Sequence, residues 1–197
     1  MEQTAALGRP SSSKYGRIVA TASMTGYIFV IAFLPMLLVA AAIFDLASFA
    51  IPNILPAAML VLFAVFLIAM AIGGHPLSWS QLSQHLLAGG VGLAAGMALF
   101  AAGWIGGGDA KLFAMASLWL GWDAMYEYSV IASLLGGMLT LGLLMFRRFP
   151  LPPLLAAQPW LLRLADREAG VPYGVALAIA ALNVLPDTEI FRLVAAS

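Results

Sequence analysis

Residues 54–72 read ILPAAMLVLFAVFLIAMAI and contain no charged, amide or hydroxyl side chain. A helix needs about 20 mostly apolar residues to cross a bilayer, so this stretch is long enough to span one. It ends at Gly73-Gly74-His75-Pro76, a cluster typical of a break in a helix. The sequence therefore predicts a membrane-spanning helix at this position.

The composition of the whole chain agrees with this interpretation. Of its 197 residues, 63% are hydrophobic and 9% are charged, whereas soluble domains carry about 25% charged residues. The polar side chains needed to cover a surface in water are missing, so apolar side chains must face lipid. Nine basic and nine acidic residues balance to a net charge of zero, which gives no electrostatic case for binding nucleic acid.

Similar apolar stretches lie before and after residues 54–72, and we expect about six spanning helices in all. They cover residues 27–44, 54–72, 86–105, 107–125, 129–146 and 171–186. The fourth is extended from Gly107 to Met125, because its apolar part alone has about half the length of a span. Residues 160–168, with an apolar and a charged face, are expected to form a short helix at the membrane surface.

The predicted fold is therefore an all-α, polytopic membrane protein. Its domains would be a polar N-terminal tail and the start of the first helix (1–26), a six-helix membrane domain (27–186) and a C-terminal tail (187–197). No secretory signal stands out near the N-terminus, because the first apolar run has no small-residue cleavage site after a short core.

The basic residues favour one orientation of these helices. If the linkers near residues 45–53, 106–111 and 147–167 share one side, that side holds Lys111 and four arginines, and the opposite linkers hold neither lysine nor arginine. The positive-inside rule then places this side in the cytoplasm. The three basic residues in residues 1–17 would lie outside, and they argue against this orientation.

The sequence gives no sign of a metal or cofactor. It contains no cysteine, which excludes disulfides, thiolate zinc sites and a cysteine nucleophile. His75 and His85 flank a polar turn at a spacing that does not suit metal ligands, and we interpret both as solvated loop residues. We therefore expect chemistry that uses neither a metal nor a cofactor.

Two aspartates lie where predicted spans end or begin. Asp45 ends the first and Asp109 begins the fourth, so both face the same side of the membrane in the six-helix topology. An acidic residue at the edge of the hydrocarbon is costly, which makes it a functional candidate. Two close carboxylates cannot both ionise cheaply. One could then take a proton from water while the other, protonated, donates a hydrogen bond to a scissile carbonyl, as aspartic peptide hydrolysis requires.

Each aspartate alone also fits a structural role at a helix end, where Asp109 would benefit from the helix dipole. Gly106-Gly107-Gly108 favours the functional interpretation, because three glycines permit close approach of backbone and a cap needs only one. A second acidic pair, Asp123 and Glu127, lies among aromatic residues on the opposite side, and we interpret it as solvated.

Gly92, Gly96, Gly103 and Gly107 fall on one stripe of the third span. Small residues in such a stripe allow helices to approach closely. We expect this stripe to serve packing within the monomer rather than dimerisation.

Three motifs resemble those of one family. Residues 106–111 read GGGDAK and resemble the G-x-G-D-x-K motif of the prepilin peptidases, which are membrane aspartic proteases. Asp45 followed by Ile51-Pro52-Asn53 resembles that family's first aspartate motif. Residues 171–174, VPYG, are similar to its late I-P-Y-G segment. The three occur in the family's order, each at a predicted helix end.

The resemblance implies an endopeptidase that removes the short basic leader of type IV prepilin or pseudopilin subunits. It would cut just after a glycine that precedes the subunit's hydrophobic segment. It would act at the cytoplasmic face of the bacterial inner membrane, as the small form found with tight-adherence (Flp-type) pilus systems. The implied catalytic pair is Asp45 and Asp109. The implied motif residues beside the pair, on the substrate side, are Gly106, Gly108, Lys111, Pro52 and Asn53.

Two departures from the family pattern stand out. The chain has no cysteine and no cysteine-rich insertion, which argues against the N-methyltransferase activity of larger relatives. Residues 46–50 carry no charge, whereas family members usually have arginines there.

Other functions stay open at this point. A presenilin-type intramembrane protease shares the GxGD motif, but its Pro-Ala-Leu motif does not occur here. A proton-coupled transporter would use the aspartates as a relay, yet they lie at predicted helix ends and the two halves show no repeat. A non-catalytic pilus assembly scaffold could keep both aspartates.

Overall fold

The computed structural model describes residues 32–149, 158–166 and 169–196. All regular structure in these residues is helical, so the predicted all-α class is confirmed. The helices are α2 (Leu34–Ser48), α3 (Ile54–Ile72), α4 (Trp79–Ala101), α5 (Gly107–Leu120), α6 (Trp122–Phe146), α8 (Pro159–Ala165), α9 (Tyr173–Val184), the 3-10 turn η2 (Leu185–Asp187) and α10 (Glu189–Ala196). The predictions for residues 1–31 lie outside the described residues.

Three of the described helices, α3, α4 and α6, are long and apolar enough to cross a membrane. The helices α2 and α9 are apolar but shorter. The 14 residues of α5 extend about 21 Å at 1.5 Å per residue, less than the hydrocarbon core of roughly 30 Å. The chain is therefore a membrane protein by its helices, and the number of six spans stays a prediction.

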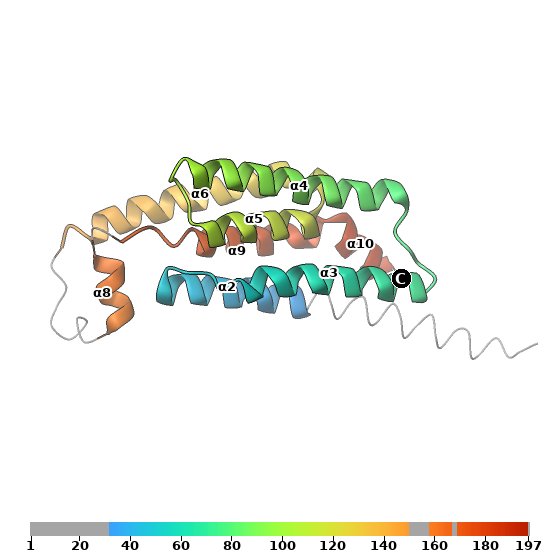
Figure 1. Cartoon of the computed structure of the whole chain (residues 1–197), viewed down its shortest axis with the longest axis horizontal. Coiled ribbons are helices and arrows are strands. Elements are labelled where there is room, and N and C mark those ends of the chain that lie inside the picture. The colour runs from blue at the N-terminus through green and yellow to red at the C-terminus, as the bar shows by residue number, and fades with distance from the viewer. Residues whose placement is uncertain (1–31, 150–157, 167–168, 197) are drawn as a thin grey trace, which may run out of the picture.

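The helices form three layers (Figure 1). The first contains α4 and α6, the second α5 and α9, and the third α2 and α3. The first turns of α5 and α9 lie at the same end of the molecule as the last turns of α2, α4 and α6. This arrangement brings three separate parts of the sequence together at one end.

The predicted helix bounds hold best where breakers enclose an apolar run. The bounds of α3 and the end of α6 at Phe146 are as predicted. The helix α4, however, begins at Trp79 and not at residue 86. The Ser78 hydroxyl accepts the Gln81 N–H at 3.3 Å and the Gln81 side chain accepts the Ser78 N–H at 2.7 Å. This capping box starts the helix within a polar segment that hydropathy alone assigned to a loop.

Several other bounds were predicted wrongly. The helix α4 ends at Ala101 and not at residue 105, and α6 begins at Trp122 and not at residue 129. The fourth helix ends at Leu120 and not at Met125, because Gly121 has φ 82° and turns the chain into α6. Asp45 was placed in a linker but lies in the last turn of α2. That helix ends where Phe49 takes a left-handed φ of 54° and donates its N–H to the Asp45 carbonyl at 2.8 Å.

Glycines bring α4 and α5 into close contact. A Cβ on Gly92 would lie 2.9 Å from the Ser117 hydroxyl, and one on Gly96 would lie 2.9 Å from the Ala110 Cα. The predicted role in packing within the monomer is confirmed for these two glycines. It is wrong for Gly103 and Gly107, since Gly103 lies in the turn after α4 and Gly107 begins α5.

The other side of α5 is fixed to α3. The Trp119 indole, fully buried, donates a hydrogen bond to the Met59 carbonyl at 3.0 Å. Its ring meets the Phe63 ring edge-on at a centroid distance of 5.2 Å. Contacts on both sides hold α5 firmly, and with it the carboxyl group at its first turn.

Candidate active site

Asp109 lies in the first turn of α5, as the sequence predicted. Its Oδ2 accepts the Gly106 N–H at 3.0 Å, so the side chain caps its own helix. The residue is only 6% exposed. Its other oxygen, Oδ1, is buried and has no hydrogen-bond partner among the described residues. One oxygen therefore fixes the orientation of the carboxyl group, and the other is left for a partner from outside, such as water or substrate.

Asp45 is held by a different helix N-terminus. Its Oδ2 accepts the Gly174 N–H at 2.6 Å, and the residue is 3% exposed. Gly174 is the second residue of α9, where backbone N–H groups have no partner within the helix. The amide and the helix dipole both favour a negative charge at this position.

The structure brings the two aspartates together. The Asp109 carboxyl group also lies close enough to the Gly174 amide to interact with it, and it acts electrostatically on Asp45. The carboxyl groups of Asp45 and Asp109, from helices far apart in the sequence, therefore lie within electrostatic range of each other. A pair arranged in this way can bind a water molecule and exchange protons with it.

Three glycines make room for this pair. A Cβ on Gly174 would lie 2.8 Å from Asp45 Oδ2 and 2.7 Å from Ile51 Cδ1. One on Gly108 would lie 3.0 Å from Ile51 Cβ, and one on Gly106 would lie 3.1 Å from Asp109 Oδ2. Ile51 thus packs between the first turns of α5 and α9, and side chains on these glycines would displace it or the carboxyl groups.

The other predicted motif residues lie beside the pair. The Lys111 ammonium donates a hydrogen bond to the Asn53 side-chain oxygen at 2.7 Å, and both residues are exposed. Pro52, next to Ile51, accepts the Leu55 N–H at 3.0 Å through its carbonyl oxygen. These contacts join the first turn of α5 to the segment before α3.

Gly174 and Ile51 belong to the site but were not predicted as site residues, although both lie in the motifs that resemble the family's. The signal for Gly174 was the VPYG segment at the start of an apolar run. Nothing local to that segment reveals that its amide faces Asp45, 129 residues earlier in the chain.

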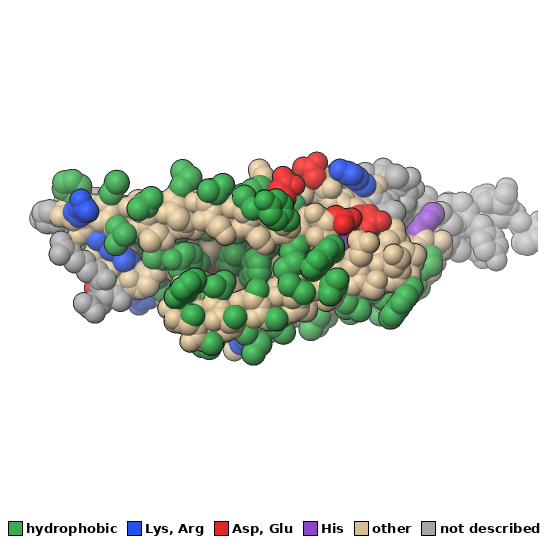
Figure 2. All heavy atoms as spheres, turned by 90° about the horizontal axis from the view of Figure 1, so that it is seen from above, with side chains coloured by type: hydrophobic (Ala, Val, Ile, Leu, Met, Phe, Trp, Pro, Cys, Tyr) green, Lys and Arg blue, Asp and Glu red, His purple; other side chains and the backbone are tan. Residues whose placement is uncertain are grey.

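Charged side chains separate between the two ends of the molecule (Figure 2). The basic residues Lys111 of α5, Arg147 and Arg148 at the end of α6, and Arg163 of α8 belong to the end that carries the aspartate pair, as does the acidic Asp166 after α8. The acidic residues Asp123, Glu127, Asp187 and Glu189 belong to the opposite end, together with Arg192. The positive-inside rule uses an uneven distribution of lysine and arginine of this kind to predict which end of membrane helices faces the cytoplasm.

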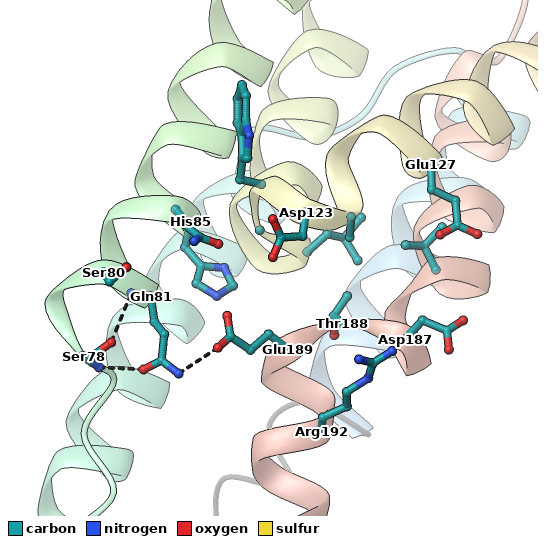
Figure 3. A pocket seen from close by; sticks show the side chains of 16 residues that line it. Ser78, Ser80, Gln81, His85, Asp123, Glu127, Asp187, Thr188, Glu189 and Arg192 are labelled. Carbon is teal, nitrogen blue, oxygen red and sulfur yellow. Dashed lines mark hydrogen bonds between the residues drawn. The ribbon is translucent and has the colours of Figure 1, made fainter.

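A polar cavity of about 550 Å³ lies at the acidic end (Figure 3). His85 lines it, and the interpretation of His85 as a solvated loop residue is wrong. The side chain is 2% exposed within α4 and donates a hydrogen bond from Nδ1 to the Leu118 carbonyl at 2.9 Å. His75 is exposed between α3 and α4, as predicted. In the described part of the chain, no three His, Cys, Asp or Glu side chains are placed to hold a metal ion.

The apolar helices define a membrane protein, and its buried pair of carboxyl groups is a candidate active site. The family model of the type IV leader peptidase family matches residues 32–141, more than half of the chain, and this match includes both aspartates. The chain therefore belongs to the type IV leader peptidase family. It is a membrane protease with a prepilin-type substrate, and the resemblance to the prepilin peptidases is confirmed. No curated protein and no solved structure matches the chain.

Proposed function

We propose that this chain is an aspartic endopeptidase that removes the leader peptide from type IV prepilin-like subunits, with Asp45 and Asp109 activating water. The observation that carries the proposal is that two buried aspartates from different helices lie within electrostatic range of each other, with Asp45 held by the Gly174 N–H and Asp109 by the Gly106 N–H. A second observation supports the proposal: the buried Oδ1 of Asp109 has no hydrogen-bond partner among the described residues. Such an atom lowers the stability of the folded protein, so its presence favours a role in binding water or substrate.

In the proposed reaction, one carboxyl group is ionised and the other is protonated. The ionised group takes a proton from a bound water as the water oxygen attacks the scissile carbonyl carbon. The protonated group donates its proton to the carbonyl oxygen. These two transfers give a tetrahedral intermediate that carries two hydroxyl groups. The proton taken from water then passes to the amide nitrogen as the C–N bond breaks, and one hydroxyl of the intermediate returns its proton to the second carboxylate. The carboxyl and amino ends leave, and both aspartates are again in their starting protonation states.

The orientation and the substrate type belong to the same proposal. Four basic side chains at the site end favour a cytoplasmic position for the aspartate pair, in a bacterial inner membrane. Flp-type prepilins are the proposed substrates, because the sequence has no cysteine-rich insertion of the larger relatives. For the same reason we propose that the new N-terminus is not methylated.

The test is co-expression with a tagged Flp-type prepilin from the same genome, followed by mobility and mass of the pilin. Wild type would be compared with Asp45→Asn and Asp109→Asn. Asp123→Asn is the matched control, since it removes an acid from the opposite end of the molecule. We expect cleavage by wild type and by the control, and no cleavage by the other two variants.

Three outcomes would each contradict a part of this proposal. Cleavage by Asp45→Asn or Asp109→Asn would remove the aspartic mechanism. Absence of cleavage by wild type, with the protein inserted in the membrane, would remove the Flp-type prepilin as substrate. A methylated product would contradict the proposed lack of methyltransferase activity.

A further inference from the structure

An apolar groove runs between α4 and α6 on the surface of the molecule (Figure 2). Its volume is about 710 Å³. The residues Ala95 and Leu99 of α4 form one wall, and residues 129–141 of α6 form the other. Phe113 of α5 and Tyr173 of α9 also line it.

The groove leads to the aspartate pair. Tyr173 directly precedes Gly174, whose amide binds Asp45. Phe113 lies four residues after Asp109, so both side chains project from the same face of α5. Ile105, which also lines the groove, directly precedes Gly106. Three residues of the groove lining are therefore within one helical turn, along the chain, of Asp109 or of the glycines that bind the two aspartates.

The α6 wall is shaped for another helix. Ser129, Ala132, Ser133, Gly136 and Gly137 line it, and small side chains allow the close approach of a second helix within a membrane. The wall spans residues 129–141, which is about 18 Å of helix. That length is more than half of the roughly 30 Å hydrocarbon core.

The hydroxyl groups on this wall do not make it polar. Ser129 donates to the Met125 carbonyl, Ser133 to the Ser129 carbonyl and Thr140 to the Gly136 carbonyl, each at 2.7 Å. The hydroxyl protons of Ser129 and Ser133 are therefore used within α6, and the Thr140 hydroxyl also has a protein partner in the Tyr173 hydroxyl of α9 at 3.3 Å. A partner in this groove needs no polar side chains to match, and its recognition rests on shape and apolar contact.

We propose that this groove binds the hydrophobic segment of the prepilin-type precursor, the segment that follows the cleavage site. The inference rests on the proposed function, because only a substrate cut at the aspartate pair has to place an apolar helix next to it. With the segment in the groove, the bond to be cut lies at the end formed by Ile105 and Tyr173. The basic leader then extends beyond the first turns of α5 and α9.

Glycines on α6 allow a direct test with a matched control. A side chain on Gly137 would meet no atom of the protein within 4 Å and would project into the groove. Gly142 lies on the same helix, is equally free of neighbours and does not line the groove. Gly137→Leu therefore fills the groove, and Gly142→Leu adds the same side chain elsewhere on α6.

The assay compares two substrates in detergent. One is the complete Flp-type precursor, and the other is a peptide that contains the leader and cleavage site without the hydrophobic segment. We expect Gly137→Leu to lower kcat/KM for the precursor by about tenfold, a misfit typical of apolar pockets, and to leave cleavage of the peptide unchanged. Gly142→Leu should change neither. Equal loss with both substrates, or no loss with either, would overturn the proposal.

Cross-linking gives a reading that does not depend on cleavage. Because the chain has no cysteine, Ser133→Cys in the groove and Leu134→Cys beside it can each be paired with one cysteine in the precursor's hydrophobic segment. Asp109→Asn would keep the precursor intact. We expect a disulfide with position 133 and not with position 134, whose side chain is 63% exposed and outside the groove.

The outcomes separate the two proposals. Equal cross-linking at both positions, or none, assigns the groove to lipid chains and refutes its role in substrate binding. If wild type cleaves neither the precursor nor the peptide, the proposed function fails, whichever position forms the disulfide.

Discussion

A single methyl group at Gly174 should impair cleavage strongly. Gly174→Ala would place a Cβ 2.7 Å from Ile51 Cδ1 and 2.8 Å from Asp45 Oδ2. Real Cβ atoms do not approach other atoms below 3.0 Å, so at least one neighbour must move. Ile51 Cδ1 is the end of a side chain that can rotate. Asp45 Oδ2 is held at 2.6 Å by the Gly174 N–H and cannot move away without weakening that bond.

The size of the effect follows from that hydrogen bond. A hydrogen bond to a charged group contributes about 1.5–3 kcal/mol. If this contribution holds the carboxyl group in its reactive position, losing it lowers the rate by roughly ten- to a hundredfold, since about 1.4 kcal/mol corresponds to tenfold. Overpacking should also lower the free energy of unfolding by about 1–3 kcal/mol.

The assay is the rate of leader removal at saturating precursor, alongside thermal unfolding in detergent. Gly90→Ala is the control, because it adds a methyl group to an exposed helical glycine with no neighbour within 4 Å. Combining Gly174→Ala with Ile51→Val removes the Cδ1 contact and keeps the Asp45 contact. We expect no recovery in this double variant.

Two results would refute the reasoning. Wild-type kcat in Gly174→Ala would mean that the Gly174 amide does not hold a reacting carboxyl group. Recovery in the double variant would mean that crowding at Ile51, and not displacement of Asp45, causes the loss.

Two further predictions concern how the site is supported. Trp119→Phe should lower the free energy of unfolding by about 1 kcal/mol through loss of the hydrogen bond to the Met59 carbonyl, with a lower Tm in detergent and unchanged kcat. Arg147 donates to the Leu164 and Gly170 carbonyls at 2.9 Å and 2.8 Å, and so joins the end of α6 to α8 and to the segment before α9. The Lys side chain in Arg147→Lys cannot make both hydrogen bonds with one planar group. We expect this variant to remove the leader several-fold more slowly, with an unchanged amount of protein in the membrane. Wild-type activity would show that the two hydrogen bonds of Arg147 do not position α9.

The sequence predicted those parts of the fold that depend on local composition. The run at residues 54–72 has no polar residue and is closed by glycine and proline, so hydropathy alone gives the bounds of α3. The start of α4 depends on two hydrogen bonds between Ser78 and Gln81, polar residues that hydropathy counts against a span. The end of α5 depends on the positive φ of Gly121. The prediction ignored this glycine, because it extended the helix to Met125 to reach the length of a span.

The candidate site was predictable to a similar degree. Asp109 could be placed at a helix N-terminus, because the glycines before it and the apolar run after it define that position. The partner of Asp45 could not be found, since the contact with Gly174 arises from packing between α2 and α9 and leaves no periodic signal in either segment. His85 was misjudged because burial against the Leu118 carbonyl depends on how α4 meets α5.

The chemistry of this site depends on backbone geometry more than on charged neighbours. Both carboxyl groups accept a hydrogen bond from a glycine N–H at the start of a helix, Gly106 for Asp109 and Gly174 for Asp45. Helix N-termini stabilise a negative charge within a poorly solvated region without placing a basic side chain beside the substrate. Glycine is needed at these positions because any side chain would occupy the space of the carboxyl oxygens. Conservative changes at the glycines should therefore cost more activity than removal of the Lys111 charge, which contacts Asn53 and neither aspartate.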